Sequence, residues 1–302
     1  MEILEWLKII VLGIVEGVTE WLPISSTGHM ILVDALWKTE SNPVLTDEFM
    51  KMFTVVIQFG AILAVVMLYF RKLWPFHTKA NRRRRSYFAE ASSNRAVCAL
   101  QRFCDNHCYL DKIILWLKIA VSCLPAILIG LPLDDWMDAH LYTPVVVAAM
   151  LILYGVGFLL IELYNKRRTP RITKLSELSW ADAALIGVFQ VLALVPGTSR
   201  SGATILGGIL LGASRGLAAE YTFFLAIPVM FGASLLKIVK FGFAFTGTQL
   251  AVLLLGMAVA FVVSVLAIKF LMGYIKKHDF SVFGWYRIAL GVIVLICAAW
   301  LL

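Results

Sequence analysis

Two stretches of the sequence, EGVTEWLPISSTGH at Glu16–His29 and QVLALVPGTSRSGAT at Gln190–Thr204, place charged and hydroxyl side chains in otherwise apolar surroundings. Ionisable side chains at bilayer depth cost about 2.5–3.5 kcal/mol each on insertion scales. Glu16, Glu20 and Arg200 would together cost on the order of 8–10 kcal/mol. A membrane protein retains such groups where they face one another or a polar cavity. The two stretches therefore predict the functional site.

The rest of the chain has the composition of a helical membrane protein. Of its 302 residues, 61% are apolar, whereas soluble domains are usually about 45–50% apolar. Apolar runs long enough to cross a hydrocarbon core of about 30 Å as helices lie at roughly 53–70, 113–131, 143–163, 220–240, 249–272 and 283–302. The sequence predicts an all-α polytopic membrane protein with six transmembrane helices, forming a single membrane domain over 1–302.

Basic residues in the loops set the expected orientation. The stretches 71–85, 166–174 and 276–277 carry Lys and Arg and are expected in the cytoplasm, whereas the acidic loop with Asp134, Asp135 and Asp138 and the uncharged stretch 241–248 are expected outside. The net charge of +8 thus indicates contact with anionic lipid and not with nucleic acid. The spans alternate without conflict only if each motif stretch enters and leaves the membrane on one side. We expect two re-entrant helix–break–helix hairpins, the first entering from outside and the second from the cytoplasm.

The two halves of the sequence repeat. A shift of 174 residues places Gly13 on Gly187, Glu16 on Gln190 and the core S-S-T-G at 25–28 on S-R-S-G at 199–202. The first repeat spans 1–165 and the second 175–302, and each contributes one hairpin and three spans. Three is odd, so the second half is inverted relative to the first. This predicts an inverted-topology repeat in which broken helices meet near the midplane.

A polar insertion of about residues 78–111 interrupts the first repeat. Its spacing of cysteine and histidine fits no common zinc pattern, so we expect a basic cytoplasmic loop that contacts anionic lipid, with a metal site formed by these ligands as the alternative. The residues concerned are Arg82 to Arg85, Cys98, Cys104, His107 and Cys108.

The helix breaks have the chemistry of an anion site. Pro23 and Pro196 end their helices, and a new helix N-terminus offers free N–H groups and a positive dipole end to an anion. Arg200 adds planar, bidentate donors that stay charged. Each feature also has a structural interpretation, because hydroxyls in membrane helices often bond backbone carbonyls and a glutamate can simply pair with an arginine. Their convergence at matched breaks favours a phosphate cradle.

At these residues the sequence closely resembles the bacterial undecaprenyl-diphosphate phosphatases, the bacitracin-resistance family, over nearly the whole chain. The resemblance implies a multi-pass enzyme of the bacterial plasma membrane that hydrolyses undecaprenyl diphosphate to undecaprenyl phosphate and inorganic phosphate. It implies recycling of the lipid carrier for peptidoglycan synthesis, and bacitracin resistance. Family functional positions carry over to Glu16, Glu20, Ser26, His29, Ser199, Arg200 and Thr204.

We expect phosphoryl transfer from the lipid diphosphate, with four catalytic residues: Glu20, Ser26, His29 and Arg200. Arg200 would clamp the diphosphate, Ser26 is the candidate nucleophile, and His29 would act as its base or protonate the leaving oxygen. Attack by water, and His29 as nucleophile, stay open. The expected substrate-binding residues are Glu16, Ser25, Thr27, Ser199, Ser201 and Thr204.

A divalent cation, Mg²⁺ or Ca²⁺, is expected between Glu16 and Glu20, which lie one helical turn apart, and would bridge to phosphate oxygens. The short, acidic or uncharged outer loops predict a cavity that opens to the outer face. The main alternative function is a transporter or lipid flippase with the same repeat, which would not need the Ser–His–Arg–diglutamate cluster; an intramembrane protease would need a second strong catalytic partner. The oligomeric state stays open, a homodimer included.

Overall fold

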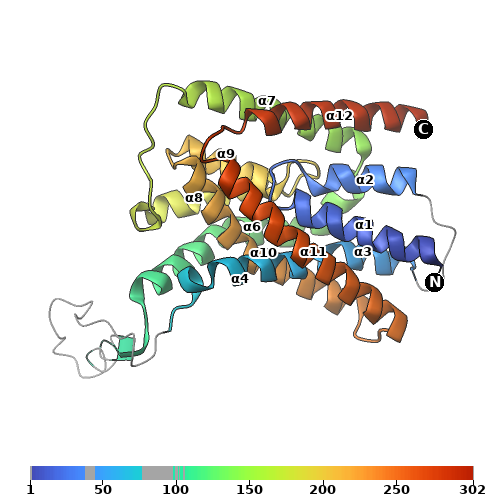
Figure 1. The fold of residues 1–302 in the computed structure, drawn as a ribbon, viewed down its shortest axis with the longest axis horizontal. Coiled ribbons are helices and arrows are strands. Elements are labelled where there is room, and N and C mark those ends of the chain that lie inside the picture. Colours follow the sequence, from blue (N-terminus) through green and yellow to red (C-terminus); the bar gives the residue numbers. More distant parts are fainter. Residues whose placement is uncertain are drawn as a thin grey trace.

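The computed structural model describes residues 2–37, 45–76, 98, 101, 103–104 and 106–301, and within these residues the chain is helical apart from turns and links (Figure 1). Six of the described helical stretches are long and apolar enough to cross a membrane: Asp47–Leu73, Leu110–Gly130, Pro144–Asn165, Arg215–Phe241, Gly247–Tyr274 and Ser281–Ala299. Large apolar side chains such as Leu128 and Leu266 are exposed on them, as a lipid-facing surface requires. The prediction of an all-α, multi-pass membrane protein with six spans is confirmed.

The long helices begin where hydroxyl side chains cap them. The spans are formed by α3 (Asp47–Val56) with α4 (Gln58–Leu73), α6 (Leu110–His140), α7 (Pro144–Asn165), α10 (Arg215–Phe241), α11 (Gly247–Tyr274) and α12 (Ser281–Leu301). At several starts a Ser or Thr oxygen accepts a hydrogen bond from the backbone N–H three residues later, which satisfies one otherwise unpaired donor. These caps are Thr46, Thr143, Ser214 and Thr246.

Four shorter helices form two pairs, each with a break in the middle. The first pair is α1 (Ile3–Thr19) and α2 (Ser26–Leu36), and the second is α8 (Trp180–Leu192) and α9 (Arg200–Leu210). Pro23 and Pro196 lie in the turns that separate them, as their missing N–H groups predict. Each motif stretch of the sequence therefore occupies the break of one pair.

The two helix pairs pack against the spans in corresponding ways. Helix α1 contacts α11 while α8 contacts α6, and α2 contacts α12 while α9 contacts α7. Helices α7 and α12 run side by side along one edge of the bundle (Figure 1). Glycines permit the closest approaches, because a Cβ added at Gly17 would lie 2.8 Å from the Ala260 carbonyl oxygen and one at Gly187 only 2.3 Å from that of Ser122.

One expected loop is helical. Asp134, Asp135 and Asp138 were predicted to lie in an outer loop, but α6 continues past the apolar span as far as His140. Pro132 lies inside this helix without ending it, and the chain turns only at Leu141–Thr143, where Thr143 caps α7. The predicted insertion at 78–111 falls mostly outside the described residues. Within the described part of the chain, no group of three or more His, Cys, Asp or Glu side chains is placed to hold a metal ion.

Candidate active site

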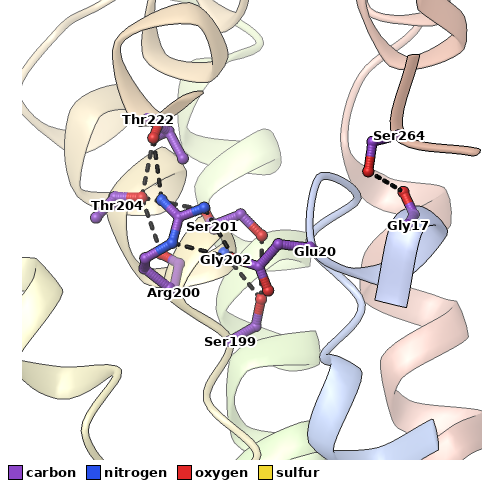
Figure 2. A network of polar contacts seen from close by, with 9 residues as sticks. All are labelled: Gly17, Glu20, Ser199, Arg200, Ser201, Gly202, Thr204, Thr222 and Ser264. Atoms are coloured by element: carbon purple, nitrogen blue, oxygen red, sulfur yellow. Dashed lines mark hydrogen bonds and ion pairs between the residues drawn. The ribbon is translucent and has the colours of Figure 1, made fainter. Parts of the chain in front are cut away.

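An ion pair joins the two helix breaks. Glu20 caps the C-terminus of α1 and Arg200 is the first residue of α9. The Arg200 Nε and Nη2 atoms donate to Glu20 Oε1 at 3.2 and 3.0 Å, and Nη1 donates to the Thr222 carbonyl oxygen at 3.0 Å (Figure 2). Only 11% of the arginine side chain and 9% of the glutamate side chain are exposed. Two residues 180 positions apart thus form one buried, oriented charge pair.

Hydroxyl groups at the start of α9 support the arginine. Ser199 caps this helix by accepting the Gly202 N–H at 3.2 Å, and its Oγ lies 3.2 Å from that of Ser201 (Figure 2). Thr204 donates to the Arg200 carbonyl oxygen at 2.8 Å and accepts from the Thr222 hydroxyl at 2.9 Å. The Thr204 hydroxyl is therefore engaged with protein groups, and it fixes the turn that carries Arg200.

Both breaks use the same strained backbone conformation. Ser25, just before α2, has φ 72° and ψ 109°, and Ser199, just before α9, has φ 68° and ψ 123°. Positive φ at a residue other than glycine costs about 1–3 kcal/mol and is concentrated at functional sites. Ser26 and Thr27 follow as the first residues of α2, half-buried and without a side-chain hydrogen bond to any other described residue. Their hydroxyls are free to meet a ligand.

Several buried polar atoms around the breaks have no hydrogen-bond partner within the part of the chain that the structure describes. They are Glu16 Oε1, Ser25 Oγ, Thr198 Oγ1 and both amide atoms of Gln190. A buried polar atom left without a hydrogen bond costs about 1–3 kcal/mol, so this cluster fits a site that takes a polar ligand. Glu16 and Gln190 occupy corresponding positions in the two motif stretches.

The glutamates fit a divalent cation. Glu20 uses only Oε1 for Arg200, so its Oε2 and the unpartnered Glu16 Oε1 are two carboxylate oxygens of the kind that Mg²⁺ and Ca²⁺ prefer. The described residues supply no third acidic or histidine ligand. A diphosphate would have to complete the coordination.

His29 contacts protein groups through both ring nitrogens. Its Nδ1 lies 2.7 Å from the Ser25 carbonyl oxygen and its Nε2 lies 2.7 Å from the hydroxyl of Tyr286 on α12. A carbonyl oxygen only accepts, so in the neutral ring Nδ1 carries the proton and Nε2 accepts from Tyr286, a tautomer assigned from its partners. Sequence reasoning missed Tyr286, which no motif contains.

Arg287 links the two breaks and was also missed. Its side chain is fully buried, with Nη1 donating to the Pro23 carbonyl oxygen at 3.2 Å and Nη2 donating to those of Gly197 and Thr198 at 2.9 and 2.8 Å. One guanidinium thereby fixes the backbone of both turns. The available signal was a lone arginine within the apolar run 283–302, because a charge at that depth predicts a specific partner.

These features define a multi-pass membrane protein with a buried, charged site where two broken helices meet. The sequence model of the family described as "Bacitracin resistance protein BacA" matches residues 9–293. The chain is 53% identical over 299 residues to an undecaprenyl-diphosphatase of Enterococcus faecalis, covering 99% of each sequence. It is 56% identical over 297 residues to one of Desulfitobacterium hafniense, covering 98% of this chain and 97% of the relative. The chain belongs to the bacitracin resistance protein BacA family, as the motifs predicted.

Proposed function

We propose that this protein hydrolyses undecaprenyl diphosphate to undecaprenyl phosphate and inorganic phosphate. The observation that carries the proposal is the buried Glu20–Arg200 pair, which joins the two breaks beside free hydroxyls and unpartnered polar atoms. The names of the relatives, undecaprenyl-diphosphatase, support the substrate. The product would return to peptidoglycan synthesis as the lipid carrier, and faster recycling would confer bacitracin resistance.

Arg200 is the anion clamp. Its guanidinium donates to Glu20 on one edge and to the Thr222 carbonyl on another. The arginine side chain is therefore oriented before substrate arrives. Preorganised donors of this kind stabilise the charge that develops on transferring phosphoryl oxygens without reorganisation during the reaction. The hydroxyls of Ser199 and Ser201 and the first N–H groups of α9 add further donors.

Ser26 is the proposed nucleophile. Its Oγ would attack the terminal phosphorus, the bond from that phosphorus to the bridging oxygen would break, and the lipid monophosphate would leave. Water would then cleave the phosphoserine and release inorganic phosphate. Direct attack by water, with Ser26 and Thr27 as ligands, is the alternative, and only the first route passes through a phosphorylated protein. Ser25 holds the turn that presents both hydroxyls.

His29 has one nitrogen for proton transfer. Because Nδ1 is committed to the Ser25 carbonyl, a proton taken from Ser26 or given to the leaving oxygen has to pass through Nε2, which Tyr286 occupies. Tyr286 is 45% exposed. It therefore relays that proton or swings aside when substrate binds.

Glu16 and Glu20 would hold a Mg²⁺ or Ca²⁺ ion together with diphosphate oxygens. A bound ion would supply positive charge to the diphosphate and to the two buried carboxylates.

The topology proposal is an inverted repeat with two re-entrant hairpins, the site opening to the outer face of the plasma membrane. Support comes from the corresponding packing of α1 on α11 and α8 on α6, and from the shared backbone angles of Ser25 and Ser199. The basic loops then lie in the cytoplasm, as the positive-inside rule requires.

The test is phosphate release from a long-chain isoprenyl diphosphate by purified protein in detergent. Ser26→Ala and Arg200→Lys are expected to lose at least about 10²-fold in kcat, since Lys cannot reproduce the bidentate fork. Ser176→Ala, which removes an exposed hydroxyl from the short 3-10 helix Leu175–Glu177, is the matched control and should retain parental activity. A transporter would move the lipid between leaflets without releasing phosphate, and folded parental protein that releases none would refute the proposal.

A further inference from the structure

A polar cavity lies at the opposite end of α9 from Arg200. It has a volume of about 270 Å³ and is formed by the end of α7, the link that follows it, the end of α9 and the start of α10. An 11-residue helix is about 16 Å long, so the cavity is separate from the proposed active site. Its charged and polar lining residues are Asn165, Arg168, Thr169, Arg171 and Arg215.

Three guanidinium groups present unused donors to this cavity. Arg171 uses Nη2 for Asp182 Oδ1 and the Leu211 carbonyl, and Arg215 uses Nε and Nη2 for the buried Glu162. Nη1 of both arginines and Nε of Arg171 have no partner among the described residues. Arg168 stacks on the Tyr164 ring with its Cζ 4.0 Å from the ring centroid, which leaves its hydrogen-bonding edge open.

The wall that carries these groups is held in place by the backbone. The Arg171 and Ile172 N–H groups donate to the Gly212 carbonyl at 2.8 and 3.0 Å, and the Ser214 N–H donates to the Ile172 carbonyl at 2.8 Å. The link after α7 is thereby fixed to the turn between α9 and α10. Donors fixed before binding lose less entropy when a ligand arrives, so the cavity is preorganised for an anion.

The surroundings distinguish a lipid from a soluble anion. Leu210 and Tyr164 line the cavity and are also exposed on the apolar surface, and Leu160 and Leu163 extend that surface along α7. A ligand with its phosphate among the arginines would have acyl chains against these side chains. Lys166, Arg167 and Lys174 in the same link would attract an anionic leaflet.

We propose that this cavity binds the phosphate headgroup of an anionic phospholipid. Arg168, Arg171 and Arg215 contact the phosphate, and Tyr164 and Leu210 contact the start of the acyl chains. The site is separate from hydrolysis and does not depend on the proposed function.

The experiment measures thermal unfolding of the purified full-length protein in detergent. The ligands are phosphatidylglycerol, phosphatidylcholine with the same acyl chains, and inorganic phosphate. Of these three ligands, only phosphatidylglycerol is expected to raise Tm, because a ligand that binds the folded protein stabilises it against unfolding. Arg168→Gln should weaken the apparent affinity about fivefold, the contribution of one basic residue near an anionic lipid. Arg167→Gln is the matched control, because it removes the same charge from the adjacent, exposed position that does not line the cavity.

Each other outcome contradicts the proposal. Equal weakening by both variants would mean general attraction to a basic surface and no headgroup site. Stabilisation by inorganic phosphate that Arg168→Gln abolishes would identify a site for a soluble anion. Equal effects of the two lipids would exclude recognition of the headgroup charge. A cooperative unfolding transition of Arg168→Gln at the parental Tm without added lipid shows that the variant is folded.

Discussion

Replacement of Arg287 tests whether one buried side chain aligns the two helix breaks. Its Nη1 contacts the Pro23 carbonyl, while Nη2 contacts both Gly197 and Thr198. Arg287→Lys keeps a charge but supplies a single nitrogen, which can serve the adjacent Gly197 and Thr198 carbonyls and not Pro23. One buried carbonyl left unpaired costs about 1–3 kcal/mol. Arg287→Met leaves all three carbonyls without this donor, so the free energy of unfolding is expected to fall by on the order of 3 kcal/mol or more.

The catalytic effect should follow the same order. A misplacement of about 1 Å can cost about 10²-fold in rate, so we expect kcat to fall at least about tenfold in Arg287→Lys and further in Arg287→Met. The assay combines phosphate release at saturating lipid diphosphate with thermal unfolding followed by tryptophan fluorescence. Lys269→Met, which removes an exposed cation from α11, is the control and should change neither quantity. Folded Lys and Met variants with kcat within threefold of the parent would refute the alignment role.

Three further predictions address the histidine, the helix packing and the topology. Tyr286→Phe should leave folding intact but shift the pH profile of kcat, because it frees the imidazole nitrogen that the hydroxyl occupies; an unchanged profile would exclude the tyrosine from proton transfer. Gly187→Ala should lower Tm by several degrees, since its Cβ would overlap the backbone of α6, whereas Gly232→Ala has open space and should not; equal Tm values would contradict the packing. A cysteine at Phe243 should react with an impermeant thiol reagent on intact cells and one at Lys174 should not, and labelling of the second would rule out the inverted repeat.

Much of this architecture could be predicted because it depends on local features of the sequence. The six spans are continuous apolar runs, and Pro23 and Pro196 mark the breaks directly. The pairing of Glu20 with Arg200 is not a local pattern. Charged residues in apolar sequence must contact one another or a polar cavity, however, and this limits the possible partners of each. Ser25 and Ser199 could be matched by the repeat, although their positive φ angles could not be foreseen.

What escaped prediction depends on contacts between distant positions. The Tyr286–His29 hydrogen bond spans 257 residues and the Arg287–Pro23 bond 264, and neither leaves a periodic signal in the sequence. The extension of α6 was missed because acidic residues and Pro132 are as compatible with a loop as with a helix end. The bonds of the Thr204 hydroxyl to the Arg200 carbonyl and the Thr222 hydroxyl could not be foreseen, because they depend on a rotamer that the sequence does not encode; its contact with substrate stays a prediction.

The central claim is that the two helix breaks form one catalytic site through Glu20 and Arg200. A double-mutant cycle of kcat/KM for phosphate release tests it, using the parent, Glu20→Gln, Arg200→Gln and the double variant. Each single change should cost about 10²–10³-fold, and the double variant should lie within about tenfold of the worse single one, because the two residues act as a unit. If the two losses multiply instead, the residues act independently and the account of a shared site is wrong.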